Sequence, residues 1–443
     1  MGLFGSAGRN YEAAQVSEGD VERLAAAVEV ERGGESELLQ ARPAKENDGI
    51  TAGVGLLKNL HDVRLDRAAG VTRNVSHTYG HELWHEDGKI QFVWRAPNET
   101  TALDLTDKIE NRYDADVSPT QRVFPTVEPE DYVAGATVHL TDSFWKPIKS
   151  PLTEKGDEDP ITDEDPYGDI TTDMEFTPRA APDGDRITAD ECRVLVQTMF
   201  SPARDVWSRG GAWGENVKDK ARGRTKPSYS ASWLGAVREK EPTRDDRKAA
   251  DILQRQYGEK GYYVTMRVFV VSPYRQVAED YARTVAGDYR RYYESFTQQG
   301  LAPDPIAPGG MVDVLTDAVT RRHEVSTRDR LAVGGKCLLN VYGLAAVAHL
   351  PNEEINSPAV DWYEMETGPG VPPDAAQMED VTPQDDTTTD RARAFDPEQT
   401  DDVPDPVEAV QGLGDGTGMD ADADDAEAEA DDDDDDEGAA MQW

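Results

Sequence analysis

His77-Thr78-Tyr79-Gly80-His81-Glu82-Leu83-Trp84-His85 and Lys89-Ile90-Gln91-Phe92-Val93-Trp94-Arg95 flank the triplet Glu86-Asp87-Gly88, and this stretch decides the fold class that the sequence predicts. An Asp-Gly pair between runs of aromatic and β-branched residues is a strong local signal for a β-hairpin. We therefore expect two antiparallel strands here, and the rest of the chain is interpreted outward from them.

The residues after the hairpin predict one helix and two further strands. Pro97-Asn98-Glu99 opens a helix that runs to about Tyr113. Strands are expected near Arg122–Val127 and Ala136–Leu140. This β-β-α-β order predicts a first α+β module over residues 71–150. The buried stripe of its helix is expected to hold Leu103, Leu105 and Ile109.

A second α+β module is expected over residues 191–373. The apolar run within Glu191–Ser201 predicts a strand, and Tyr262–Val271 is the strongest strand signal in the protein. A long amphipathic helix is expected over Tyr274–Gln298, and Gly300-Leu301-Ala302-Pro303 would end it. The expected fold class is therefore α+β, with two small mixed modules and a disordered acidic tail.

Three further segments flank or separate these modules. Residues 1–70 predict a weakly ordered leader, with short helices near Val21–Val30 and Gly55–Leu65; an arm that docks on a partner is the alternative. Residues 151–190 are expected to form an acidic, Pro-rich linker. Residues 374–443 have an acidic composition that cannot bury a core, so we expect a disordered tail. This tail would serve solubility or, as the alternative, mimic a nucleic-acid backbone in a partner's basic groove.

The net charge of the 443-residue chain is −42, and it is not confined to the tail. From Asp374 onward there are 26 acidic and 2 basic residues, which leaves 62 acidic and 44 basic residues, a net charge of −18, before it. A body this acidic is typical of extreme halophiles, because in molar salt the Debye length is about 3 Å and self-repulsion is screened. The composition argues against a broad contact with a DNA backbone, which requires a Lys/Arg-rich face.

The two cysteines, Cys192 and Cys337, show no pairing pattern, so a reducing cytoplasm is the expected location. Peripheral attachment to a membrane through partners is compatible with this location. No apolar run approaches 18 residues, and no signal-peptide pattern is present. We therefore expect no integral membrane segment.

The segment His81-Glu82-Leu83-Trp84-His85 matches the H-E-x-x-H pattern of zinc metallopeptidases, and His77 adds a third imidazole. That chemistry needs a helix, on which residues i and i+4 share a face and the Glu activates a zinc-bound water. The flanking residues alternate as in a strand, where successive members of this histidine triplet would lie about 13 Å apart. We therefore expect no metal site.

No other motif supports catalysis or a cofactor. Val333-Gly334-Gly335-Lys336-Cys337 is the nearest approach to a phosphate-binding loop. However, Arg330 stands where the first glycine of that loop should be, and the hydroxyl that holds magnesium is missing. The carboxylates are too numerous for one acid–base pair to stand out. We expect no enzyme activity, no catalytic residue and no cofactor.

Residues Arg204–Lys248 form the single basic segment of the chain, and they include three tryptophans. A mixture of basic and aromatic residues is typical of surfaces that neutralise and stack single-stranded nucleic acids. The alternative is that these cations neutralise the protein's own acid. The residues expected to contact a nucleic acid or an acidic partner are Arg209, Trp213, Lys218, Lys220, Arg222 and Arg224.

A proline-rich connector follows the apolar run Leu344–Ala348. It contains the corner His349-Leu350-Pro351, then Pro358 and Pro372-Pro373, and each proline fixes φ and prevents the helix from continuing. Shorter blocks precede it in the chain: Phe92–Pro97, Arg112–Val117, Glu130–Tyr132, Trp145–Lys149, Asp165-Pro166, Gln197, Ser201–Ala203, Trp207 and Arg267. In this order, the blocks and the connector resemble the non-catalytic N-terminal region of FtsK/HerA-type ATPases of type IV secretion and conjugative DNA transfer in archaea and bacteria.

In that family the connector leads straight into the nucleotide-binding domain, whereas here an acidic tail follows and the basic segment looks enlarged. The resemblance implies a non-enzymatic adaptor from a halophilic archaeon or its mobile element. It would assemble with a separately encoded HerA/FtsK-like P-loop ATPase in conjugation-like DNA transfer or virus packaging; the alternative is a structural or virion-associated protein. Nucleic-acid contact and self-association stay open. The connector residues expected to bind the motor are Leu350, Pro351, Ile355, Pro358 and Trp362.

Because His81 and His85 are expected on a strand, the purified protein should bind no stoichiometric zinc. Elemental analysis of the protein, before and after dialysis against a chelator, checks this expectation. One zinc ion per chain that is lost in the His81→Ala variant would contradict it.

Overall fold

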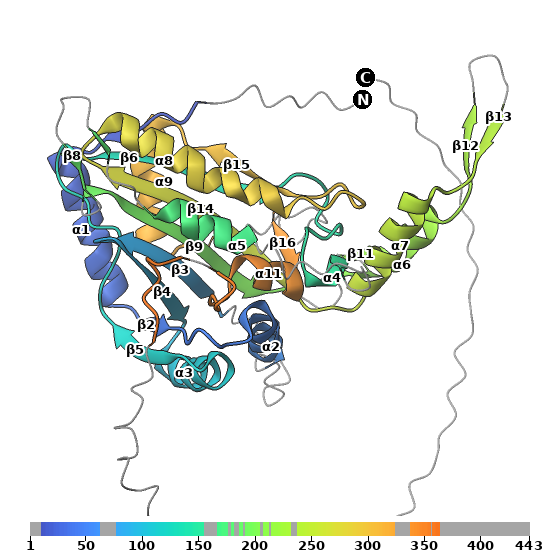
Figure 1. Ribbon diagram of the computed structural model, residues 1–443, viewed down its shortest axis with the longest axis horizontal. Coiled ribbons are helices and arrows are strands. Elements are labelled where there is room, and N and C mark those ends of the chain that lie inside the picture. The colour runs from blue at the N-terminus through green and yellow to red at the C-terminus, as the bar shows by residue number, and fades with distance from the viewer. Residues whose placement is uncertain are drawn as a thin grey trace, which may run out of the picture. The chain divides into compact units, whose positions relative to one another are not determined.

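One antiparallel sheet runs through the part of the chain that the computed structural model describes (Figure 1). That part comprises residues 10–62, 77–154, 166–175, 179–180, 186–188, 191–203, 207–211, 214–231, 237–323, 337–355 and 357–363. The strand order is β1-β6-β14-β9-β3-β4-β2-β5, and in addition β15 pairs with β6 and β16 with β14. The strands are β1 (Ala14–Gln15), β2 (Glu37–Arg42), β3 (Tyr79–Glu86), β4 (Lys89–Ala96), β5 (Asp116–Thr120), β6 (Tyr132–Leu140), β9 (Arg193–Pro202), β14 (Gly261–Ser272), β15 (Leu301–Pro305) and β16 (Leu338–Asn340).

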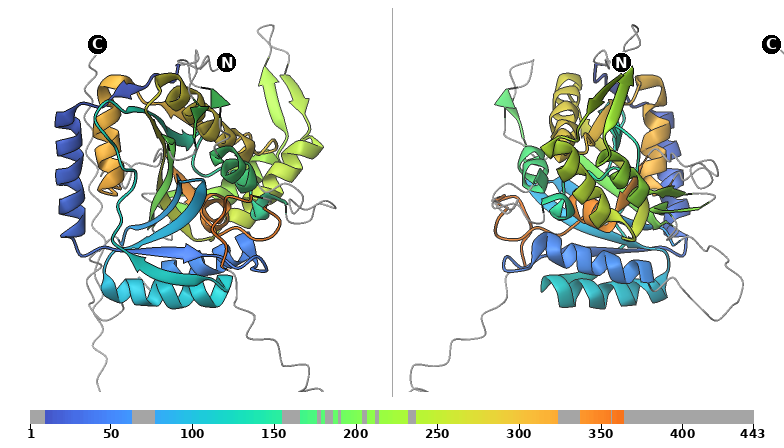
Figure 2. Two further views of the ribbon diagram at one scale, coloured as in Figure 1. Left: turned by 60° about the vertical axis from the view of Figure 1, so that its left-hand side comes forward. Right: turned by 90° about the vertical axis from the view of Figure 1, so that its right-hand side faces the viewer.

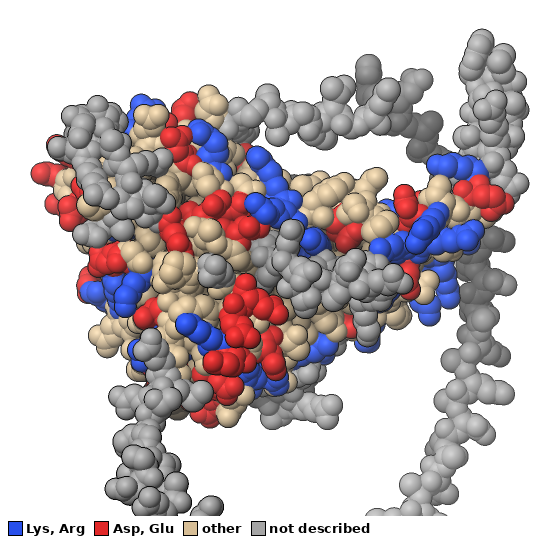
Figure 3. All heavy atoms as spheres, in the orientation of Figure 1, with Lys and Arg blue, Asp and Glu red and all other residues tan. Residues whose placement is uncertain are grey.

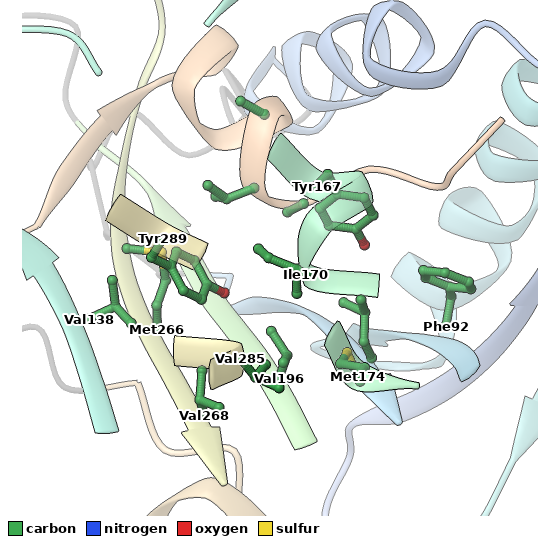
Figure 4. Packing of buried hydrophobic residues seen from close by; sticks show 14 of the residues in the cluster. Phe92, Val138, Tyr167, Ile170, Met174, Val196, Met266, Val268, Val285 and Tyr289 are labelled. Atoms are coloured by element: carbon green, nitrogen blue, oxygen red, sulfur yellow. The ribbon is translucent and has the colours of Figure 1, made fainter. Parts of the chain in front are cut away.

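Helices cover both faces of this sheet, so the expected α+β class is confirmed (Figure 2). Helices α1 and α9 pack on one face, and α2, α3, α5, α8 and α11 pack on the other. Figure 4 shows part of the second layer, where Ile170 of α5 and Val285 of α8 lie against Val196 of the sheet. The helices are α1 (Glu18–Arg32), α2 (Gly49–Asp62), α3 (Glu99–Tyr113), α4 (Pro151–Glu154), α5 (Pro166–Met174), α6 (Val217–Arg224), α7 (Arg244–Gln256), α8 (Arg275–Gly287), the 3-10 helix η5 (Asp288–Tyr292), α9 (Pro308–Val319) and α11 (Val341–Val347).

Strands β3, β9 and β14 occupy the middle of the sheet, and they are buried on both faces. Every residue of β9 after Arg193 is buried, so both faces and both edges of this strand need partners. Val196 of β9 lies opposite Leu83 of β3 on one side and Val268 of β14 on the other. The expected hairpin of β3 and β4 is present, and Asp87 and Gly88 have positive φ in its turn.

The expected division into two modules is wrong, because strands from both regions of the chain share this sheet. Strands β3, β4 and β6 come from residues 71–150, yet β3 pairs with β9 and β6 with β14, which come from residues 191–373. Neither region alone has enough strands to surround β9 and β14. One compact unit consequently spans Met1–Glu366. The expected tail, residues 374–443, lies outside the described residues.

Segments that were expected to be a leader and a linker also belong to this unit. Within residues 1–70, β2 lies between β4 and β5, and α2 packs against α11. Within residues 151–190, α5 packs against η5 and α8. The composition of these segments is rich in small and acidic residues, so the few apolar positions that anchor each element gave no clear signal in the sequence. These buried positions are Leu38, Leu39 and Ala41 in β2, Leu56, Leu57 and Leu60 in α2, and Tyr167, Ile170 and Met174 in α5.

Three local expectations also need correction. The strand expected at Arg122–Val127 lies earlier, at β5, where Pro119 is tolerated because β5 is an edge strand. The helix expected over Tyr274–Gln298 ends at Gly287 and continues only as the short η5. Leu103 of α3 is 67% exposed, although Leu105 and Ile109 are buried as expected.

A network of buried polar side chains crosses the three central strands on the face that α9 covers. Glu82 of β3, Gln197 of β9 and Arg267 of β14 lie in one cross-strand row. Gln197 Nε2 donates to Glu82 Oε1 at 2.9 Å, and Arg267 Nη1 donates to Gln197 Oε1 at 2.9 Å. Arg321 follows α9 and reaches the same carboxylate: its Nη2 donates to Oε2 at 3.2 Å, and its Nε lies 2.9 Å from Oε1.

The Glu82–Arg321 pair is withdrawn from water, since the two side chains are 1% and 0% exposed. Removing such ions from water costs several kcal/mol each, and the pair is tolerated only when further hydrogen bonds satisfy it. Trp84 Nε1 donates to Glu82 Oε2 at 2.8 Å, and Arg321 Nη1 donates to the carbonyl of Val319 at 3.1 Å. The network thus ties the C-terminal end of α9 to the centre of the sheet.

The Arg321→Met variant should lose about 3–5 kcal/mol of unfolding free energy, because it leaves the Glu82 carboxylate buried without its cation. Denaturant unfolding at high salt, followed by circular dichroism, measures this loss. Arg23→Met is the matched control: it breaks the exposed ion pair with Asp313, 2.7 Å long, and should cost about 0–1 kcal/mol. Equal losses for the two variants would show that the buried pair is dispensable.

A second buried carboxylate, Asp288 at the start of η5, lies beside the acidic face of α5. Burial, a hydrogen bond with the side chain of Asp173 and the charge of Asp169 raise the pKa of Asp288 to about 7, and Arg291 opposes this rise. Arg291 is engaged mainly with Asp169, at 2.7 Å, and lies 3.9 Å from Asp288. Asp288 therefore holds a proton over a pH range in which an exposed aspartate is ionised.

Stability should consequently fall as the pH rises from about 4 to about 7, because only the folded state binds the Asp288 proton in that window. Asp288→Asn should remove this slope and, at pH 8, stabilise the protein by on the order of 2 kcal/mol. Unfolding midpoints across this pH range measure the effect. Asp280→Asn, a partly exposed change on the neighbouring α8, is the control that should leave the slope intact. An unchanged slope in Asp288→Asn would refute the assignment.

Candidate partner and nucleic-acid interfaces

The connector after α11 is held firmly against the core. His349 Nδ1 donates to the carbonyl of Ala345 at 2.9 Å, and the ring of His349 lies 4.2 Å from that of Tyr167. Asn47 Nδ2 donates to the carbonyl of Pro351 at 2.6 Å. The expected corner at His349-Leu350-Pro351 is therefore a fixed turn between α11, α5 and the segment before α2.

The last described residues of the connector run along the β3–β4 hairpin. The amide of Ile90 donates to the carbonyl of Ala359 at 2.7 Å, and the amide of Asp361 donates back to the carbonyl of Ile90 at 3.1 Å. Beyond them, the amide of Tyr363 donates to the carbonyl of Pro43 at 2.9 Å. Three backbone hydrogen bonds thus fix the path of the chain up to residue 363.

The five connector residues that were expected to bind a partner divide into two groups. Leu350, Pro351 and Ile355 are buried in this chain's own core, so their side chains are not available to a partner in this structure. Pro358 is exposed, and Trp362 is half-buried with the ammonium of Lys45 5.8 Å from its ring. The expected partner surface is thereby reduced to Pro358 and Trp362.

The basic segment forms an arm beside the end of the sheet (Figure 1). Two small hairpins, β10 (Arg209–Gly211) with β11 (Gly214–Asn216) and β12 (Ser228–Ala231) with β13 (Val237–Lys240), alternate with α6 and α7. We call residues Val217–Gln256, which span α6, β12, β13 and α7, the basic arm. It carries 11 Lys and Arg against six Asp and Glu, in a chain whose net charge is −42.

The two helices of the basic arm are defined by side-chain caps and by a small apolar contact. Asn216 caps α6 by accepting from the amide of Asp219 at 3.2 Å, and Thr243 with Asp246 forms a capping box on α7. At the body end of the arm, Gln256 Nε2 donates to the carbonyl of Trp145 at 2.8 Å. The apolar residues that pack together between α6 and α7 are Val217, Ala221, Ala250 and Leu253.

The residues expected to contact a polyanion lie mainly on α6. Lys218, Lys220 and Arg222 are exposed on this helix, and Arg224 is half-buried at its end. Arg209 is exposed on β10, and Trp213 lies outside the described residues. In Figure 3, blue side chains gather over α6 and α7, whereas the visible body carries red patches with smaller blue groups between them. The basic segment therefore supplies one concentrated cationic surface.

The H-E-x-x-H segment lies on β3, as expected, and this geometry separates its residues. His81 faces the apolar layer, where its ring lies 4.6 Å from that of Trp94, while Glu82 belongs to the opposite face beside Arg321. Burial lowers the pKa of His81 to about 3, so the imidazole is neutral at ordinary pH. Among the described residues, no group of three His, Cys, Asp or Glu side chains is arranged to hold a metal ion.

A serine–histidine–threonine arrangement was not expected from the sequence. Ser201 Oγ of β9 lies 3.0 Å from His323 Nε2, and Thr265 Oγ1 of β14 lies 2.9 Å from His323 Nδ1. The spacing resembles that of a nucleophile, a base and its orienting group. However, Ser201 is only 2% exposed and is followed by Pro202, which has no amide hydrogen for an oxyanion. The arrangement is best explained as a tie between two strands and the segment after α9.

Two other expectations concerned a phosphate-binding loop and a membrane-spanning segment. Val333–Lys336, the nearest approach to a phosphate-binding loop, is outside them. None of the described helices is both long enough and apolar enough to cross a bilayer.

A family comparison covers nearly the whole of the compact unit. Residues 7–363 match the family model described as a domain of unknown function, DUF8128. No curated protein matches the sequence. The matched range begins before β1 and ends at Tyr363, the last described residue of the connector, so the family corresponds to the single sheet and its helices rather than to either expected module. The chain is a member of the DUF8128 family.

Proposed function

We propose that this protein is a non-enzymatic assembly module for a HerA/FtsK-like DNA-translocating P-loop ATPase. Conjugation-like DNA transfer or virus packaging would be its setting. The proposal combines the resemblance of its sequence blocks to the region that precedes such motors with one structural observation. That observation is the backbone hydrogen bonding of residues 359–363 to the β3–β4 hairpin and to Pro43.

These hydrogen bonds hold the connector in one path, and that path bears on the position of a partner. In the resembling proteins the connector leads into the motor domain, so its path determines where the motor sits relative to the body. A flexible connector would transmit no orientation, whereas an exit fixed to a central hairpin places any neighbouring body at a defined position. The half-buried Trp362 and the exposed Pro358 lie at this exit, and they supply an aromatic and a rigid contact.

The Trp362→Ala variant should weaken capture of a HerA/FtsK-like ATPase from the same genetic neighbourhood by about 30-fold or more, since a buried aromatic anchor contributes about 2 kcal/mol or more at an interface. Titrated pull-down in high salt, with folding checked by circular dichroism, measures the change. Tyr293→Ala is the matched control, because Tyr293 is 51% exposed and lies in a different part of the sequence.

Equal affinity of Trp362→Ala and the parent protein would refute a role of the connector in binding. If removal of residues 401–443 instead abolished capture at high salt, the acidic segment would be the partner-binding element.

A further inference from the structure

The charge of α6 is unusual for this protein. From Val217 to Lys226 there are five cations and one carboxylate, Asp219, although the chain as a whole has 88 acidic and 46 basic residues. Lys218 with Arg222 and Lys220 with Arg224 are like-charge pairs at i and i+4, each of which destabilises a helix by about 0.2–0.5 kcal/mol. The chain as a whole is acidic, yet α6 carries cations that repel one another. This contrast indicates that the cations have a function.

Some of these cations are engaged within the arm or at its base. Arg222 Nη1 lies 3.5 Å from Asp219 on the same helix, and both side chains are more than 60% exposed. The ammonium of Lys218 lies 5.6 Å from the ring of Tyr257, and that of Lys220 lies 5.4 Å from the ring of Trp145. The ring of Tyr257 does not neutralise the charge of Lys218, which stays exposed on α6.

Other cations gather where the helices meet the β12–β13 ribbon. Arg224 ends α6, Lys240 ends β13, and both lower the pKa of Asp246, which is set mainly by hydrogen bonds from Thr243. Within the described residues no ion pair involves Arg224, Lys226, Lys240, Arg244 or Arg247. All but Arg224 are exposed. Lys226, Lys240, Arg244 and Arg247 therefore present their charges at the surface of the basic arm.

We propose that the basic arm binds the phosphate backbone of a nucleic acid through α6 and the adjoining base of the β12–β13 ribbon. The ribbon is the reason to prefer a nucleic acid to an acidic protein. A two-stranded ribbon has the dimensions that a major groove admits. This inference does not depend on the motor partner proposed above.

The test compares the full chain with two variants that have the same net charge. In the arm variant, Lys218, Lys220, Arg222 and Arg224 are each changed to Gln. In the control variant, the exposed body residues Arg23, Arg32, Arg275 and Arg283 are changed to Gln. Fluorescence anisotropy with labelled single-stranded and duplex DNA is measured over a range of KCl concentrations in which circular dichroism shows all three proteins folded.

The arm variant should bind at least about tenfold more weakly than the parent at the lowest KCl concentration of the series, and the control variant should bind like the parent. For duplex DNA, the slope of log K against log salt should become shallower by about 3–4 when four phosphate contacts are lost. For single strands each contact contributes about 0.7, so the expected change is about 3. The parent's affinities for the two DNA forms, compared at one KCl concentration, distinguish groove binding from single-strand binding.

Parent-like DNA affinity of the arm variant, or an equal loss in the control variant, would overturn the proposal. Absence of DNA binding by the parent, together with arm-dependent binding of polyglutamate, would assign the arm to an acidic protein partner instead.

Discussion

The ion pair between Glu82 and Arg321 is the constraint on which the arrangement of this protein depends. It lies at the centre of the sheet, where Gln197 and Arg267 extend it across two more strands. A carboxylate in this position is tolerated only with its cation and its hydrogen-bond donors in place, because an unpaired buried charge costs several kcal/mol. The network therefore specifies one register for β3, β9 and β14 and one position for the end of α9. Alternative packings of the same apolar strands would leave the charges unmatched.

The same central strands position the candidate interfaces. Ile90 of the β3–β4 hairpin forms two backbone hydrogen bonds with the connector. The path of the connector is therefore fixed to a hairpin that is packed on both faces. The basic arm is attached to the sheet through β14, which follows it in the sequence. Strand β14 pairs with β16, and Asn340 of β16 donates to Gln256 of α7 at 2.9 Å. Both candidate interfaces are thus attached to strands of the central sheet.

Electrostatics separates two kinds of surface on this protein. The acidic composition is typical of proteins that work in molar salt, where charge–charge interactions beyond about 3 Å are screened. A cationic surface in the same solvent gains little from long-range attraction, so it needs close contacts and stacking to bind a polyanion. The proposed binding surface of the basic arm would rely on close contacts of this kind, which the exposed Lys218, Lys220 and Arg222 of α6 can make.

The sequence by itself determined the local elements whose signals depend on neighbouring residues. The Asp87-Gly88 turn, helix α3 and strands β9 and β14 follow from turn chemistry and side-chain periodicity, and the alternation around His81 correctly indicated a strand. Only the tertiary structure decided that one sheet would replace two modules, because strand pairing joins residues more than 100 positions apart and leaves no local pattern. For the same reason the partner of Glu82 could not be inferred: Arg321 lies 239 residues away, and a charged side chain carries no local mark of burial. Burial of Leu350, Pro351 and Ile355 likewise followed from long-range packing, which placed three of the five expected interface residues in the core.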